Sequence, residues 1–151
     1  MKNLLNHVAE IKATFSSKKK LSELPKISCS SQAQELFRDN WDPGSLELVE
    51  EFKILILNRN HKVLGQSVIS RGGYSGTVVD PKLVFAIALT AKASAIIAAH
   101  NHPSGNLTPS KADLALTNKL QKAGELLELP LLDHLIISGE GYLSFADEGL
   151  M

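Results

Sequence analysis

The chain has a single cysteine, Cys29, among its 151 residues, and it has no excess of charge of either sign. A lone thiol cannot form an internal disulfide, and it suits a reducing compartment. Lysine plus arginine number 16 and aspartate plus glutamate number 16, so no net positive field draws the chain toward nucleic acid or an anionic membrane. Direct nucleic-acid binding is therefore not expected. Cys29 lies among serines and is not expected to be a catalytic thiol.

Long apolar runs are also missing. The runs at residues 54–57 and 93–99 are far shorter than the roughly 20 residues that a membrane-spanning helix needs. Residues 1–15 lack the uninterrupted apolar core of a signal peptide. These absences predict a cytoplasmic protein without membrane association. The length fits one globular domain that can bury its own core.

Strand and helix signals alternate along most of the chain. Apolar spacing and turn residues predict strands at residues 50–58, 62–71, 94–99, 131–138 and 142–145. They predict helices at residues 30–38, 81–91 and 109–125, the first with an N-cap at Ser30-Ser31. For residues 7–15 the pattern leaves a strand and a short helix open. The expected fold class is α/β, a mixed β-sheet flanked by helices.

One stretch, AAHNHPSGNLTPSKAD at residues 98–113, carries two histidines at the end of a predicted strand. Residues two apart in a strand share a face, so His100 and His102 can bind the same ion while Asn101 points away. The other histidines are interpreted differently. His7 and His61 are expected to be exposed. His134, at the start of another apolar strand and next to an aspartate, is expected to be a hydrogen-bonded structural residue rather than a ligand.

The helix that follows the two histidines supplies a third ligand. Thr108 and Pro109 predict an N-cap and a first helical residue, which places Ser110 and Asp113 on one helix face. Two imidazoles and one carboxylate, with a fourth position left for water, form a ligand set typical of catalytic zinc. Bound zinc lowers the pKa of water to about 7. The sequence therefore predicts a Zn²⁺ site formed by Asp113 and the two histidines.

Hydrolysis by a metal-bound water also needs a carboxylate that accepts and returns a proton. Glu50 has the strand parity of Phe52 and Ile54, an apolar row that must face the interior. Glu51 shares its face with Lys53 and could pair with it in solvent. Because a buried carboxylate is costly unless it has a task or a partner, parity favours Glu50 as the general base. Spacing alone does not bring it to the metal.

The histidine stretch is similar to a known motif. The run His100-Asn101-His102-Pro103-Ser104-Gly105, followed by Pro109-Ser110 and Asp113, resembles the JAMM metal motif in the form carried by the RadC family. Further RadC-like segments are Glu50-x-Phe52, Ala95-Ile96-Ile97, Leu132-Asp133-His134 and Ser144-Phe145. The resemblance covers about residues 45–150.

The resemblance implies a JAB/MPN-like sandwich with a cytidine-deaminase-like layout in residues 46–151. Residues 1–45 are then an N-terminal extension that packs on the core. The full-length RadC pattern has a helix-hairpin-helix region ahead of the JAB domain. No such segment is recognisable in residues 1–45, so its DNA association is not expected here. In this pattern the zinc ligands are matched by His100, His102 and Asp113, the glutamate acting through metal-bound water by Glu50, and the oxyanion-binding serine by Ser110.

Together these observations predict a zinc-dependent hydrolase of the JAMM type, a metalloprotease that cleaves a peptide or isopeptide bond in a peptide or protein substrate. The alternative is a non-catalytic or accessory zinc-binding module in DNA repair, recombination or mobile-element biology. A zinc nucleobase deaminase is set aside, because it needs a P-C-x-x-C pair and the chain has only Cys29. The substrate and the oligomeric state, with a homodimer as one option, are left open.

Overall fold

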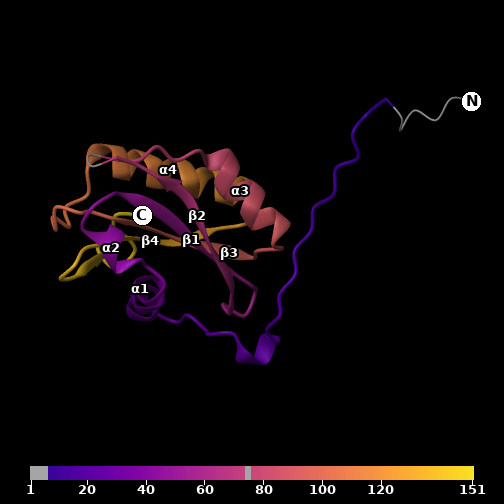
Figure 1. Cartoon of the computed structure of the whole chain (residues 1–151), viewed down its shortest axis with the longest axis horizontal. Coiled ribbons are helices and arrows are strands. Elements are labelled where there is room, and N and C mark those ends of the chain that lie inside the picture. The colour runs from indigo at the N-terminus through magenta and orange to yellow at the C-terminus, as the bar shows by residue number, and fades with distance from the viewer. Residues whose placement is uncertain (1–6, 74–75) are drawn as a thin grey trace, which may run out of the picture.

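The computed structural model describes residues 7–73 and 76–151, and within them the chain forms one five-stranded sheet in the order β2-β1-β3-β4-β5 (Figure 1). The strands are β1 (Glu51–Leu57), β2 (Val63–Arg71), β3 (Ala95–Asn101), β4 (Leu131–Ile137) and β5 (Tyr142–Ser144). Strands β3 and β4 run parallel, and the other neighbouring pairs run antiparallel. The predicted α/β class with a mixed sheet is confirmed.

Helices cover both faces of this sheet (Figure 1). Helices α3 (Pro81–Thr90) and α4 (Lys111–Leu126) pack on one face, and α1 (Ser30–Asp39) and the short α2 (Pro43–Leu46) lie on the other. Strand β1, which lies between β2 and β3, is buried on both sides. Its residues Phe52, Ile54 and Ile56 join the α3–α4 core, whereas Leu55 and Leu57 join the core on the α1 side. Among the described residues, no helix is both long and apolar enough to cross a membrane.

The helix start predicted at Pro109 and the N-cap predicted at Ser30-Ser31 are both wrong. Helix α4 begins at Lys111, not at Pro109, and its N-cap is Ser110. The Ser110 hydroxyl accepts from the Asp113 amide at 3.0 Å, and the Asp113 carboxylate accepts from the Ser110 amide at 2.7 Å. This capping box satisfies two amides that would otherwise lack partners, which favours Ser110 over Thr108 as the cap. Helix α1 begins at Ser30, with Cys29 in the N-cap position and no side-chain cap.

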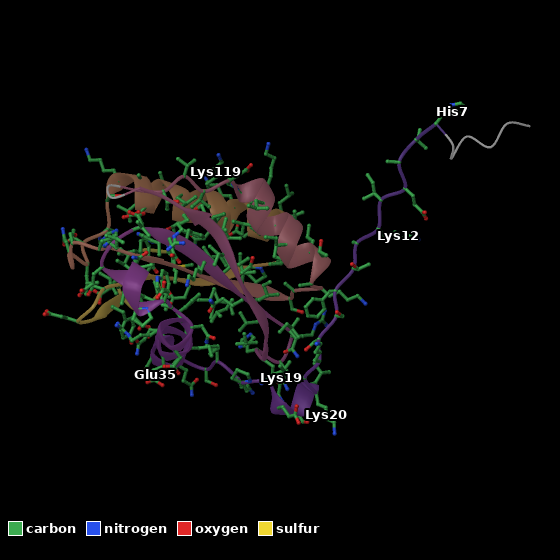
Figure 2. All side chains as sticks on the ribbon, viewed as in Figure 1. His7, Lys12, Lys19, Lys20, Glu35 and Lys119 are labelled. Atoms are coloured by element: carbon green, nitrogen blue, oxygen red, sulfur yellow. The ribbon has the colours of Figure 1, made fainter. Side chains whose placement is uncertain are left out.

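The chain from residue 7 to residue 20 extends away from the sheet, whereas Ile27, just before α1, is buried in the core on the α1 side (Figure 1). Residues 7–20 form neither helix nor strand and are exposed, so both alternatives for residues 7–15 are wrong. Val8 and Ile11 are 63% and 91% exposed, because no element among the described residues covers them. Figure 2 shows Lys12, Lys19 and Lys20 along this segment. Residues 1–6 lie outside the described residues, and the domain boundary at residue 45 stays a prediction.

The expected pair between Glu51 and Lys53 forms, but not in solvent. Their charged groups lie 3.4 Å apart, and their side chains are only 7% and 4% exposed. The Lys53 ammonium lies 4.0 Å from the ring centre of Trp41, which follows α1, and Arg71 approaches Glu51 within 3.2 Å. Strand parity places Glu51 and Lys53 on one face of β1, but this face is buried only because α1 and α2 pack on it. Glu51 is therefore part of a buried ion pair on the face opposite to α3 and α4.

Candidate metal centre

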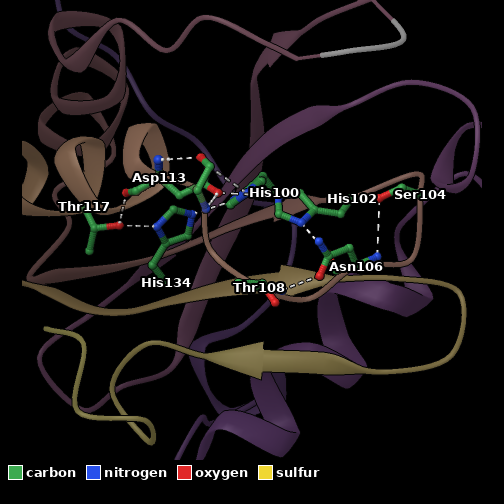
Figure 3. Close-up of polar contacts among 9 residues, drawn as sticks. His100, His102, Ser104, Asn106, Thr108, Asp113, Thr117 and His134 are labelled. Carbon is green, nitrogen blue, oxygen red and sulfur yellow. Dashed lines mark hydrogen bonds and ion pairs between the residues drawn. The ribbon is translucent and has the colours of Figure 1, made fainter.

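The three predicted ligands come together at the end of β3 (Figure 3). His100 lies in β3, His102 directly follows this strand, and Asp113 lies in the first turn of α4. The Nε2 atoms of the two histidines are 3.0 Å apart. The carboxylate oxygens of Asp113 lie 3.2 Å from Nε2 of His100 and 3.5 Å from Nε2 of His102. Fold and spacing therefore direct two imidazole nitrogens and one carboxylate to the same point.

A chain of hydrogen bonds determines which nitrogen of His100 faces this point (Figure 3). The Thr117 hydroxyl donates to the backbone carbonyl of Asp113 at 2.8 Å, so it accepts from Nδ1–H of His134 at 2.7 Å. The Nε2 atom of His134 is then left as an acceptor, and it receives Nδ1–H of His100 at 2.8 Å. Because a neutral imidazole carries one proton, His100 presents its Nε2 lone pair to the cluster.

His102 is oriented in the same sense by its own loop. Its Nδ1 atom donates to the backbone carbonyl of Asn106 at 2.5 Å, which leaves Nε2 as the free lone pair. The loop closes tightly because Gly105 adopts a φ of 84° and donates its amide to the His102 carbonyl. The Asn106 side chain accepts from the Thr108 amide at 2.9 Å and holds the other side of the loop. Both histidines therefore have tautomers suited to cation binding.

Electrostatics favour a cation at this point. Two lone pairs and a carboxylate repel one another unless a positive charge lies between them. Burial alone would raise the pKa of Asp113, but its interactions with the His100 and His102 rings and with the Ser110 amide outweigh burial and hold that pKa well below its usual range. The hydrogen bond to Asp113 raises the pKa of His102 in spite of partial burial. Without a metal, a proton on His102 would supply the missing positive charge.

His134 is a hydrogen-bonded structural residue, as predicted, but its ring does not bond to the adjacent Asp133. Its ring is fully buried between Phe52 and the stacked ring of Phe145, whose centre is 4.7 Å away. Burial, followed by the charge of His100, lowers its pKa well below the ordinary value, so the ring is neutral as the hydrogen-bond chain requires. The adjacent Asp133 accepts from the backbone amide of His134 and not from its ring.

Glu50 lies directly before β1 and borders a cleft beside the predicted ligands. It lines this cleft, of about 460 Å³, together with His102, Ser110 and Asp113. Burial raises the pKa of Glu50, and the nearby histidines only partly offset this effect. The Ser110 hydroxyl uses a lone pair to cap α4, so its own proton is free to be donated into the cleft. The tertiary fold thus gathers all five predicted site residues, although α4 and the segment before β1 are far apart in sequence.

Comparison with known proteins identifies the family. A family model described as the RadC-like JAB domain matches residues 27–150. The chain belongs to this RadC-like JAB domain family. A UPF0758 protein of Flavobacterium johnsoniae is 50% identical over 101 residues, which cover 67% of this chain and 44% of that relative. A UPF0758 protein of Salinibacter ruber is 35% identical over 136 residues, or 89% of this chain and 57% of that relative. The match spans less than half of the first relative's length.

Sequence reasoning missed two participants in this RadC-like site. Thr117 had a usable signal, because it lies one helical turn after Asp113 and so shares its helix face. The contact between His134 and His100 had no local signal in the sequence, since these residues are 34 positions apart and meet only because β3 and β4 pair in parallel. Asn101 was correctly expected to point away from the histidines, but its own contacts were not foreseen.

Proposed function

We propose that this RadC-like JAB domain is a zinc-dependent hydrolase that cleaves a peptide or isopeptide bond. The observation that carries the proposal is the convergence of two Nε2 lone pairs and the Asp113 carboxylate beside Glu50 in one open cleft. Two neutral nitrogens and one carboxylate oxygen fit Zn²⁺ with a position left for water. Bound there by His100, His102 and Asp113, Zn²⁺ would supply a Lewis acid and a water of lowered pKa.

Glu50 and Ser110 would carry out the proton transfer and the stabilisation of the oxyanion. The Glu50 carboxylate has its pKa raised by burial, which brings it closer to the working pH of a general base and acid. It would accept a proton from the attacking water and return it to the leaving amine. The Ser110 hydroxyl, whose proton is free, would donate to the oxygen that becomes negatively charged on the scissile carbonyl.

The surroundings of the site support a chain-like substrate. The lining of the cleft includes the polar residues Ser104, Asn106 and Thr108. An adjoining hollow of about 260 Å³, which shares Glu50 and Asp113 with the cleft, is lined by Val78, Val79 and other apolar residues. A peptide that lies across both would meet hydrogen-bonding groups in the cleft and apolar contacts in the adjoining hollow. The proposal concerns this domain, which spans only part of its longer relatives.

The proposed function is tested with zinc-loaded protein and a library of peptides and isopeptide-linked pairs. Cleavage is followed by mass spectrometry, which locates the broken bond and the oxygen taken from labelled water. Incorporation of one labelled oxygen into the new carboxyl group is expected. Cleavage that survives complete removal of metal by a chelator would refute a metal-dependent mechanism.

Zinc affinity is expected to fall as the pH falls. In the metal-free protein the pKa of His102 is raised by its hydrogen bond to Asp113, so below that pKa zinc must displace a proton from Nε2. One competing proton weakens binding by up to about tenfold for each pH unit below the pKa. Titration with a zinc indicator from about pH 8 down to pH 6 measures this slope. A flat profile over this range would contradict the assigned ligand.

The hydrogen-bond chain behind His100 predicts an effect of Thr117→Val on zinc binding. Valine keeps the shape of threonine but removes the acceptor for Nδ1–H of His134, so the orientation of His100 is no longer enforced. Loss of such a supporting partner typically weakens metal affinity about 10–100-fold. Calorimetric titration with zinc measures the change. Thr90→Val is the matched control, because Thr90 makes the same helical bond to Ala86 at 2.7 Å, at the end of α3 and outside the cluster of predicted ligands.

A further inference from the structure

Asn101 lies between the two proposed histidine ligands, but its side chain points to the opposite face of the sheet. It is fully buried and makes three hydrogen bonds to backbone groups. Its Oδ1 atom accepts from the Glu51 amide at 2.7 Å. Its Nδ2 atom donates to the carbonyls of Leu46 at 2.7 Å and Val49 at 2.8 Å. All three partners belong to the segment of residues 46–51, which links α2 to β1.

This segment needs a partner because the strand ladder stops before it. The β1–β3 pairing begins at Phe52, which lies opposite His100. The amide of Glu51 is buried just beyond the last pair, and a buried amide without a partner is costly. The Asn101 side chain accepts from the Glu51 amide in place of a strand-to-strand hydrogen bond. Its two donated bonds then hold the turn that leads from α2 into the strand.

The residue that this segment presents to the cleft is Glu50. Its backbone carbonyl accepts from the Gly72 amide at 2.8 Å, so the segment is held by β2 on one side and by Asn101 on the other. The side chain of Glu51 is bound to Lys53 and Arg71 on the α1 side. Since adjacent residues of an extended chain face opposite ways, fixing Glu51 on that side directs Glu50 toward His100 and the cleft.

We propose that Asn101 is a positioning residue, which holds residues 46–51 so that the Glu50 carboxylate faces the metal centre. This inference rests on the proposed function, because it assigns Glu50 a task in hydrolysis. One β-strand then serves both parts of the site. His100 binds on one face of β3, and the adjacent Asn101 orients the proton-transfer group from the other face.

The test compares Asn101→Ala with Asn58→Ala. Asn58 is a matched control, because its side chain also accepts from two backbone amides, at 3.0 and 2.9 Å, but at the opposite end of β1. Amide hydrogen exchange is measured residue by residue. Loss of one net hydrogen bond, about 1.4 kcal/mol, is expected to speed exchange of the Glu51 amide roughly tenfold in Asn101→Ala and not in Asn58→Ala. If Asn101→Ala does not fold, Asn101→Ser replaces it.

Cleavage is then measured in two backgrounds. In the otherwise unchanged protein, Asn101→Ala is expected to lower kcat about 10²-fold, because a displaced catalytic group loses its alignment. In the Glu50→Gln background the same substitution is expected to change kcat less than about twofold, because the group that it positions is already removed. Zinc content should stay the same throughout. Rescue of kcat by Asn101→Ser relative to Asn101→Ala would support the assignment further.

Two results would overturn the inference. One is unchanged exchange at Glu51 in Asn101→Ala, and the other is an equal loss of kcat in both backgrounds, which would indicate a general structural effect. Failure of the proposed function is distinguishable from either. In that case the unsubstituted protein cleaves no amide substrate, while the exchange measurement still decides whether Asn101 holds residues 46–51.

Discussion

Asp113→Asn is expected to abolish stoichiometric zinc binding. Asparagine keeps an acceptor for the Ser110 amide, so the start of α4 is preserved, but it removes the charge that balances the cation. Loss of one charged ligand from three is expected to weaken binding on the order of 10³-fold, equivalent to about 4 kcal/mol. Zinc content after dialysis, measured by atomic absorption, should fall from about one ion per chain to a trace.

His61→Ala serves as the control for that experiment. His61 is exposed in the turn between β1 and β2, and it does not belong to the His100–His102–Asp113 cluster. Its substitution should leave the zinc content unchanged, whereas His100→Ala should reproduce the loss seen for Asp113→Asn. Full zinc occupancy in a folded Asp113→Asn protein would exclude this carboxylate as a ligand.

Glu50→Gln is expected to remove hydrolysis while zinc stays bound. Glutamine preserves the size of the side chain but cannot accept a proton, and loss of such a group typically costs about 10²–10⁴-fold in rate. The folded protein should not be weakened. Burial raises the pKa of Glu50, so the stability that this carboxyl contributes when protonated is lost as the pH rises through its pKa. At neutral pH the uncharged glutamine avoids that loss, and thermal unfolding should show an equal or higher midpoint.

The neighbouring Glu51→Gln supplies the contrast, with the opposite expected outcome. It would leave Lys53 buried without its anionic partner, and breaking a buried ion pair in this way costs about 3–5 kcal/mol. Denaturant unfolding measures this difference, and kcat of the folded fraction should change far less than in Glu50→Gln. If Glu51→Gln lost activity without losing stability, the assignment of the two glutamates would have to be reversed.

Much of the fold could be predicted because its elements have local signals. The strand at β3 is a short apolar run, and α3 starts at Pro81 as predicted, with the Asp80 side chain as its N-cap. Local signals mispredicted a helix start where two residues could each act as the N-cap. Thr108-Pro109 and Ser110 both resemble a helix start, and only the reciprocal bonds between Ser110 and Asp113 decide in favour of the second. The prediction for residues 7–15 was wrong for a different reason, since an apolar alternation forms no strand without a neighbouring strand to pair with.

The sequence by itself determined the donor set of the site. Two histidines at strand spacing and an aspartate at the start of a helix are close together along the chain, so local geometry directs all three to one point. Strand parity likewise separated Glu50 from Glu51. These inferences need only the periods of a strand and a helix, which are properties of the backbone.

Only the tertiary structure decided how those groups are held and oriented. The bonds from His134 to His100 and from Asn101 to Glu51 join residues 34 and 50 positions apart. They depend on the order of strands in the sheet, which no local spacing reveals. Local spacing likewise did not reveal that Glu51 and Lys53 are buried. Strand parity gives the face that a residue occupies, but burial depends on which helices pack on that face. The ligand set is therefore local in sequence, whereas its orientation is a property of the assembled fold.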